Sequence, residues 1–317
     1  MTQNPRIFDV VVIGAVCIDT NIYLADGDID FSVEANFSEN IDYIGCAGGY
    51  SSRAFTQLGY KTAFIGYLGD DHNGKRIHQE FKKDGITSIF FLDPQGTKRS
   101  INFMYSDGRR KNFYDGKGSM DMKPDLEKCR EILSQTNLIH VNIVNWSRYL
   151  LPLAKELGIT ISCDIQDVVD ANDVYRKDYI NHADILFFSC VNNPDPTPLI
   201  KIFQRSDPER IIVVGMGAQG CALAYRNEIK FYPPVTMAKP VIDTNGAGDS
   251  LAVGFLSSYC LDGYKLEDSV LRGQIAARYT CTIKASSSVL INKPKLNTFY
   301  ERIKSEQSNK ETIRIKD

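Results

Sequence analysis

The chain has 317 residues, of which 43% are hydrophobic and 24% are charged, as in an ordinary globular protein with one large domain or two smaller ones. Its 37 Lys and Arg residues nearly balance 39 Asp and Glu residues, which argues against the basic surface that nucleic acids need. No apolar run approaches the roughly 18–20 residues of a membrane span, and the N-terminus lacks a signal-peptide pattern.

The cysteines and histidines indicate neither a disulfide framework nor a metal cluster. The eight cysteines are scattered without a CxxC pair, and most lie within apolar stretches. We expect them to be buried thiols of a protein in the reducing cytoplasm. The four histidines are too dispersed for a metal cluster, so the metal ligands stay unknown at this point.

Apolar runs of strand length alternate along the chain with amphipathic stretches of helix length. Continuous apolar runs are typical of strands buried on both faces, as parallel sheets require. The predicted strands are residues 10–13, 62–65, 138–144, 160–163, 185–188 and 211–214. The predicted helices are residues 51–59, 74–85, 125–136, 149–158 and 247–261, and Gly59, Gly85 and Gly158 lie where C-terminal caps would be. This alternation predicts an α/β sandwich.

Two segments, at about residues 20–44 and 87–116, interrupt that pattern. Apolar and polar residues alternate there, as in SINFMYS at residues 100–106, so one face of each strand should be buried. We expect these segments to form a small antiparallel sheet that projects from a single domain spanning residues 1–300. The polar residues 304–317 are expected to form a frayed C-terminal tail.

The sequence DTNGAGD at residues 243–249 carries the strongest chemical signal. The small residues Gly246, Ala247 and Gly248 precede an apolar helix, so their N–H groups could surround an anion at its positive end. Asp249 would repel a phosphate, but it could accept the proton of a hydroxyl that attacks phosphorus. A glycine-rich turn in which Asp249 only caps the helix is the structural alternative.

Two other glycine-rich segments match nucleotide-binding patterns only in part. GMGAQG at residues 215–220 fits GxGxxG, but a hairpin with its turn near Asn227 should follow it, whereas a dinucleotide site needs a helix. GDDHNGKR at residues 69–76 comes close to a P-loop, but two acids would face the phosphates and an arginine replaces the hydroxyl residue. A turn that caps a helix near Gly74 explains this second segment better.

Taken together, these motifs resemble those of the ribokinase-like (PfkB) family of carbohydrate and nucleoside kinases. Residues 243–249 fit the family signature DTxGAGD without exception, and further segments in the family's order extend the resemblance over roughly residues 7–292. These segments are GAVCID at 14–19, GCAGG at 45–49, TAFIGYLGDD at 62–71 and GAQG at 217–220. The resemblance implies a three-layer α/β/α sandwich with a mostly parallel sheet, and a small sheet that acts as a lid and often as a dimer contact.

The resemblance also implies an ATP-dependent kinase that uses Mg²⁺ and phosphorylates a hydroxyl of a sugar or sugar-like substrate. The implied catalytic residues are Asp249 as the base and Gly246, Ala247 and Gly248 as an anion hole. The implied substrate-binding residues are Asp19, Gly48, Gly49 and Tyr50, and the implied nucleotide-binding residues are Gly217, Gly220, Ser189 and Asn192. Many family members also have a monovalent-cation site, which would place K⁺ near Asp243 and Thr244.

Three positions depart from the family pattern. Tyr50 stands where the family has a substrate-binding Asn, SCVN at residues 189–192 replaces the magnesium-organising NxxE, and Gly215 replaces a Thr. Tyr50 and the aromatic residues of the second insertion could stack on a base, so a nucleoside kinase is the first alternative. A catalytically weak sugar- or nucleotide-binding homologue is the second, because the NxxE pattern is lost.

Overall fold

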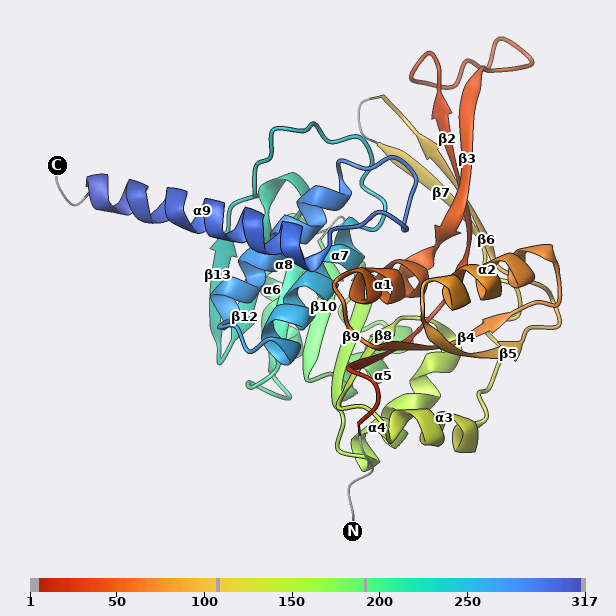
Figure 1. Cartoon of the computed structure of the whole chain (residues 1–317), viewed down its shortest axis with the longest axis horizontal. Helices are drawn as coiled ribbons and strands as arrows, with labels where there is room; N and C mark the ends of the chain where they lie inside the picture. The colour runs from red at the N-terminus through yellow and green to blue at the C-terminus, as the bar shows by residue number, and fades with distance from the viewer. Residues whose placement is uncertain (1–5, 107–108, 191–192, 315–317) are drawn as a thin grey trace.

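The structure is a computed structural model that describes residues 6–106, 109–190 and 193–314, with side chains described to residue 306. Within these residues, helices cover both faces of a nine-stranded main sheet, and a four-stranded small sheet stands to one side (Figure 1). The predicted three-layer α/β/α architecture is therefore confirmed. None of the described helices is long and apolar enough to span a membrane.

The main sheet has the strand order β13-β12-β11-β10-β9-β8-β1-β4-β5. Its strands are β1 (Val10–Ile13), β4 (Thr62–Leu68), β5 (Thr87–Leu92), β8 (Leu138–Asn142), β9 (Thr160–Asp167), β10 (Ile185–Ser189), β11 (Ile211–Gly215), β12 (Cys221–Tyr225) and β13 (Glu228–Tyr232). The strands from β5 to β11 pair in parallel, whereas β12 and β13 form the predicted antiparallel hairpin. A strand starts at Cys221, so the helix that a dinucleotide site would need does not follow Gly220.

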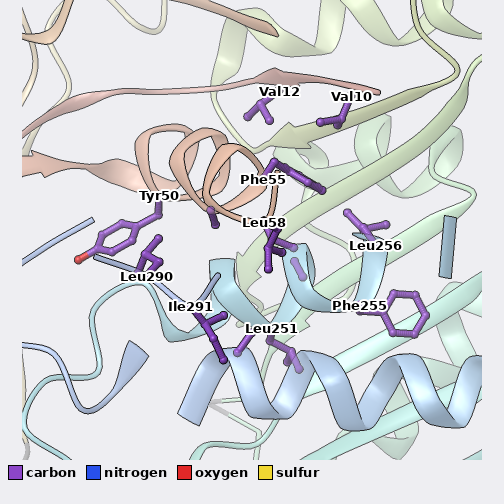
Figure 2. Packing of buried hydrophobic residues seen from close by; sticks show 14 of the residues in the cluster. Val10, Val12, Tyr50, Phe55, Leu58, Leu251, Phe255, Leu256, Leu290 and Ile291 are labelled. Atoms are coloured by element: carbon purple, nitrogen blue, oxygen red, sulfur yellow. The ribbon is translucent and has the colours of Figure 1, made fainter. Parts of the chain in front are cut away.

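Alternate residues of β1 belong to two separate hydrophobic clusters, one on each face of the main sheet. Val10 and Val12 pack with helices α1 (Cys46–Gln57), α2 (His72–Lys83), α7 (Ala247–Leu256), α8 (Leu266–Thr280) and α9 (Lys293–Arg314). Figure 2 shows Phe55 and Leu58 between β1 and helix α7. Val11 and Ile13 pack with α3 (Leu126–Leu133), α4 (Leu151–Glu156), α5 (Val174–His182) and α6 (Thr197–Gln204). Because successive side chains of β1 point to opposite faces of the sheet, this strand packs against the helical layers on both sides.

Several helix caps and turns occur where the sequence predicts them, because the residue types at these positions favour the required conformation. Gly59, Gly85 and Gly158 follow their helices with φ of 92°, 78° and 67°, the left-handed cap that glycine favours. Asp71 caps α2 by accepting a hydrogen bond from the Gly74 N–H (2.8 Å), which confirms the capping-turn interpretation of that segment. The remaining turns are the 3-10 helices Asn145–Leu150 and Gly217–Gln219 and the π-helical turn Ser257–Leu261.

The small sheet has the order β3 (Ser38–Gly45), β2 (Cys17–Leu24), β6 (Arg99–Met104) and β7 (Arg110–Asp115). Strands β2 and β6 pair in parallel, so the expectation of a purely antiparallel sheet was wrong. The second insertion also starts later than residue 87, because residues 87–92 form β5 at the edge of the main sheet. The residues of β5, TSIFFL, are partly exposed along the strand and do not alternate, so this strand was wrongly grouped with the inserted ones.

Two further expectations differ from the structure. Helix α9 continues through residues 304–314, which we expected to form a frayed tail, and it projects away from the body (Figure 1). Cys17 and Cys46 form a disulfide that joins the start of β2 to the start of α1, although all cysteines were expected to be free. Their separation of 29 residues carries no motif, so only the pairing of β2 with β3 brings them together.

Candidate active site

The amino end of helix α7 lies at the carboxyl edge of the main sheet. A Cβ added to Gly215, the last residue of β11, would lie 3.7 Å from Leu251 of α7. Open α/β sheets bind their ligands at this edge. The N-cap residue of α7 is Gly246, which has no side chain to cap the helix, so the positive end of the helix dipole can act on an anion there.

Gly246, Ala247 and Gly248 form the turn into α7, as the signature predicted. Gly246 has φ of 74° at the N-cap position, and a Cβ added to Gly248 would meet no atom within 4 Å. The Ala247 N–H donates to the Thr244 carbonyl at 3.3 Å, a long bond that closes the turn. The open space beside Gly248 can therefore admit an anion next to main-chain donors.

Tyr50 supports this turn from the side of helix α1. A Cβ added to Gly246 would lie 2.2 Å from the Tyr50 Cε1 atom, so only glycine fits there. The Tyr50 ring is 3% exposed and meets the edge of Tyr43 with 6.0 Å between ring centroids. Because the ring is covered, it shapes the turn and offers little surface for stacking on a base.

Asp249 lies in the first turn of α7 with three charged groups acting on it. Burial, followed by the negative charge of Asp164, raises the pKa of Asp249 well above its ordinary value. Asp19 raises this pKa further, whereas the positive charge of Arg110 lowers it. A carboxylate whose pKa is raised in this way is a better proton acceptor than an ordinary aspartate.

The sequence analysis missed Asp164. This residue lies near the carboxyl end of β9 and is 8% exposed, and burial raises the pKa of its carboxyl to about 6. Its Oδ1 accepts a hydrogen bond from the Gln166 N–H (2.8 Å). An acid directly after an apolar parallel strand was the available signal, because ligands gather at that edge.

Asp19 lies on β2 of the small sheet, where burial raises the pKa of its carboxyl to about 7. Hydrogen bonds from the Cys46 N–H and the Tyr43 side chain oppose this rise. A Cβ added to Gly45 would lie 2.1 Å from the carboxylate, so the backbone of β3 packs directly against it. Asp19 is therefore a rigidly supported acid whose charge also reaches Asp249.

Gly48 and Gly49 lie inside the first turns of α1 and not in a loop before it. Both are buried, and a Cβ added to Gly48 would lie 2.6 Å from the Ala15 carbonyl oxygen. A Cβ added to Gly49 would lie 3.3 Å from Ile44 and Val16 side chains. Close packing of α1 against β1 and β3 thus accounts for both glycines, and neither is open to a ligand in this arrangement.

The small sheet buries a polar face. The Asn102 amide donates to Asn21 Oδ1 (2.9 Å), and the Asn112 amide donates to Asn102 Oδ1 (2.8 Å). On the opposite face of the same strands, Ile101 and Phe113 are exposed, which reverses the usual pattern. The period-2 signal was visible in the sequence, but it did not indicate which of the two faces is buried.

Asp243 ties the small sheet to the signature loop. Its Oδ2 accepts hydrogen bonds from the Asn21 amide (2.8 Å), the Tyr23 hydroxyl (2.6 Å) and the Ala285 N–H (3.2 Å). Its Oδ1 accepts a hydrogen bond from the Asn245 N–H (2.8 Å). These donors occupy the Asp243 carboxylate, so a monovalent cation near Asp243 and Thr244 would need the carbonyl oxygens of this loop, and the K⁺ site stays a prediction.

The expected nucleotide-binding residues gather at the ends of β10 and β11. Ser189 ends β10 and pairs with Gly215, and Gly217 lies exposed in the following turn with φ of 56°. Gly220 has φ of 96°, and a Cβ there would lie 2.0 Å from the Tyr232 carbonyl oxygen, so glycine is required. Asn192 lies outside the described residues.

Asp164 and Asp249 are candidate carboxylates for a magnesium site, which stays a prediction. Each has a raised pKa, and the charge of Asp164 is one cause of the rise at Asp249. A divalent cation beside this pair would relieve their repulsion, and carboxylate oxygens are ligands that Mg²⁺ prefers. If Asp249 acts as the base, we expect Asp164 to be the ligand.

Comparisons with known proteins identify the family of the chain. A model of the pfkB family carbohydrate kinases matches residues 8–292. Acarbose 7(IV)-phosphotransferase of Actinoplanes sp. is 28% identical over 293 residues, which cover 91% of this chain and 97% of the relative. A microbiome-derived acarbose kinase, Mak1, superposes with a TM-score of 0.84 at 26% identity and covers 93% of this chain and 99% of its own.

Ribokinase of Arabidopsis thaliana, solved with ribose and ATP, shares the fold with a TM-score of 0.75 at 17% identity, covering 92% of this chain and 98% of its own. The family model spans nearly the whole described chain, and it includes the signature turn, Asp249 and the small sheet. The chain therefore belongs to the pfkB family of carbohydrate kinases.

Proposed function

We propose that this carbohydrate kinase transfers the γ-phosphoryl group of ATP to a hydroxyl of a sugar or sugar-like substrate. The observation that carries the proposal is Asp249, a carboxylate with a raised pKa in the first turn of a helix with an uncapped N-terminus. This arrangement places a proton acceptor beside main-chain donors that can hold a phosphate. A glycine-rich turn in which Asp249 only caps the helix stays the structural alternative, and an Asp249→Asn variant that keeps its activity would favour it.

In the proposed reaction, Asp249 accepts the proton of the substrate hydroxyl as its oxygen attacks the γ-phosphorus. The bond between the γ-phosphorus and the β–γ bridging oxygen breaks, which leaves ADP and a phosphorylated sugar. The amides around Gly246 and Gly248 hold the charge on the transferring group. Bound Mg²⁺ would neutralise charge on the phosphates, and Asp164 would hold it.

The polar face of the small sheet supports a sugar as the substrate. Asp19, Asn21 and Asn102 are each at most 6% exposed, and they present carboxylate and amide groups on the face that meets the body. Such groups donate to and accept from hydroxyls, which are the functional groups of sugars. Acarbose and fructose, named in the relatives, are therefore the first sugars to test.

A nucleoside as the substrate has less support. That alternative depended on Tyr50 and on the aromatic residues of the second insertion stacking on a base. The Tyr50 ring is covered by Gly246 and Tyr43, whereas Phe113 and Tyr114 of the insertion are exposed. The second alternative, a catalytically weak sugar- or nucleotide-binding homologue, can be distinguished from an active kinase only by measuring turnover. We therefore propose a sugar kinase and keep nucleosides as a comparison in the assay.

The experiment is ADP release by the purified full-length protein with ATP and Mg²⁺, measured across ribose, fructose, acarbose, inositol and adenosine. ADP release with a sugar, and its loss in Asp249→Asn, would support the proposal. Release with adenosine alone would favour the nucleoside kinase. Binding of a sugar or of ATP without any ADP release would instead identify an inactive homologue.

The homodimer through the small sheet stays a prediction. The outer face of this sheet exposes Ile101 and Phe113, and Phe103 packs against Phe113 with ring centroids 5.7 Å apart. An apolar outer face is typical of a surface covered by a second copy. Sedimentation of the wild type and of Phe113→Ser would test this, and a monomeric wild type would contradict it.

A further inference from the structure

Arg110 reaches from the small sheet to the turn that precedes α7. It lies on β7 opposite Met104 of β6, and its Nη1 donates a hydrogen bond to Asn245 Oδ1. The Asn245 amide lies 3.5 Å from the Met104 sulfur on its other side. Asn245 occupies the variable position of DTxGAGD and is 5% exposed. Two paired residues of the small sheet therefore fix this variable side chain.

The charge of Arg110 acts on both acids of the site. It lowers the pKa of Asp19 and the pKa of Asp249, so the guanidinium lies close enough to both carboxylates for its charge to be felt. Nevertheless, no carboxylate among the described residues lies within 4.0 Å of Arg110 as an ion-pair partner. Its hydrogen-bond partner is the neutral amide oxygen of Asn245, and Arg110 itself is exposed.

A guanidinium has five N–H donors and forms its strongest bonds with paired oxygens of carboxylates or phosphates. Among the residues whose side chains the structure describes, the Asn245 oxygen is the hydrogen-bond acceptor of this fork. An exposed cation whose charge acts on two acids, and which a neutral oxygen holds, is thus arranged to bind a further anion. The anion-binding turn begins at Gly246, the residue after Asn245.

We propose that Arg110 is a catalytic residue that binds the oxygens of the γ-phosphoryl group during its transfer, an inference that rests on the proposed function. The substrate oxygen bonds to the γ-phosphorus, its proton goes to Asp249, and the bond to the bridging oxygen of ADP breaks. Arg110 donates to the γ-phosphoryl oxygens throughout and exchanges no proton. Asn245 is a positioning residue that aims the guanidinium.

The test compares Arg110→Gln and Arg110→Lys with Lys111→Gln. Lys111 is the matched control, because it is the next cation on β7 and its side chain points to the other face of the sheet. We expect Arg110→Gln to lower kcat by about 100-fold or more, as removal of one donor to a transition-state oxyanion does. Arg110→Lys should retain part of the activity, and Lys111→Gln should match the wild type.

Three readouts separate this role from a structural one. Added guanidinium ion should restore part of the kcat of Arg110→Ala, which a misfolded variant could not show. The acidic limb of the kcat profile should move to higher pH in Arg110→Gln, because a charge that lowers the pKa of Asp249 is lost. The melting temperature should stay near that of Lys111→Gln.

Equal kcat values for Arg110→Gln and Lys111→Gln would overturn this inference and leave the proposed function intact. If the wild type phosphorylates no tested substrate, the proposed function fails, and titration of ADP with aluminium fluoride decides the role of Arg110. Tighter binding with fluoride than without it in the wild type, but not in Arg110→Gln, would support phosphoryl binding. The same tightening in both proteins, or none in either, would overturn it.

Discussion

A methyl group at Gly246 tests how closely the turn before α7 depends on helix α1. In Gly246→Ala, the new Cβ would lie 2.2 Å from Tyr50 Cε1 and 2.3 Å from Tyr50 Cδ1. Tyr50 is 3% exposed and packs against Tyr43, so its ring has little room to retreat. The turn must therefore shift away from the ring, and the main-chain donors at α7 shift with it.

The expected cost has two parts. The left-handed conformation at φ of 74° costs an alanine about 1–2 kcal/mol. Overpacking against the Tyr50 ring adds about 1–3 kcal/mol. Gly246→Ala should thus lower the free energy of unfolding by roughly 2–5 kcal/mol. A displacement of the turn by about 1 Å should also lower kcat by roughly 100-fold.

Gly59→Ala is the matched control, because Gly59 has φ of 92° but a Cβ there would meet no atom within 4 Å. It should lose only the conformational part of the stability, measured by denaturant unfolding, and keep its kcat. In the double variant Tyr50→Ala with Gly246→Ala, kcat should exceed that of Gly246→Ala alone. A normal kcat in Gly246→Ala, or no recovery in the double variant, would refute the role of this contact.

Three further predictions follow from the charges and the disulfide. Asp249→Asn should lower kcat about 100- to 10,000-fold with little change in melting temperature. Wild-type kcat should fall with falling pH, because only the ionised Asp249 accepts a proton. A pH-independent kcat would contradict this role. Asp19 has a pKa of about 7 in the fold against 3.8 as the ordinary value, so the folded state binds the extra proton and loses this stabilisation as the pH rises between the two. The melting temperature of Asp19→Asn relative to wild type should therefore rise from about pH 5 to about pH 8, and a constant difference would argue against the raised pKa. The denatured, unreduced protein should show six reactive thiols out of eight cysteines, since two form the disulfide. Reduction should lower the free energy of unfolding by about 3–4 kcal/mol, as expected for a disulfide between residues 29 positions apart. Eight reactive thiols would show that Cys17 and Cys46 are not bonded.

Most strands of the main sheet were predictable because their signals are local, although β5 was not. Short apolar runs that alternate with helix-length segments, as at Val10–Ile13, are typical of strands buried on both faces. The ends of several helices were predictable for the same reason, because glycines follow three helices and Asp71 caps the start of α2. The signature at residues 243–249 likewise located the turn and Asp249, since its chemistry depends on neighbouring residues.

The rest of the site depends on contacts between segments that are distant in the sequence, and such contacts produce only weak local sequence patterns. Asp164 and Arg110 lie in different sheets, and each was one acid or base among many in its own segment. The parallel pairing of β2 with β6 joins residues about 80 positions apart, which no hairpin signal records. The burial of the polar face was not predictable from the alternation alone, because it depends on contacts of that face with the body, such as those of Asn21 and Tyr23 with Asp243.

The interior position of β1 in the sheet has a consequence for the synthesis of the protein. This strand precedes both of its neighbours, β4 and β8, along the chain, and β8 begins only at Leu138. A nascent chain must therefore hold four consecutive apolar residues unpaired on one side until β8 has left the ribosome. Deletion of β1 would remove an interior strand and separate β8 from β4, whereas loss of the distal end of α9 would leave every described strand in place.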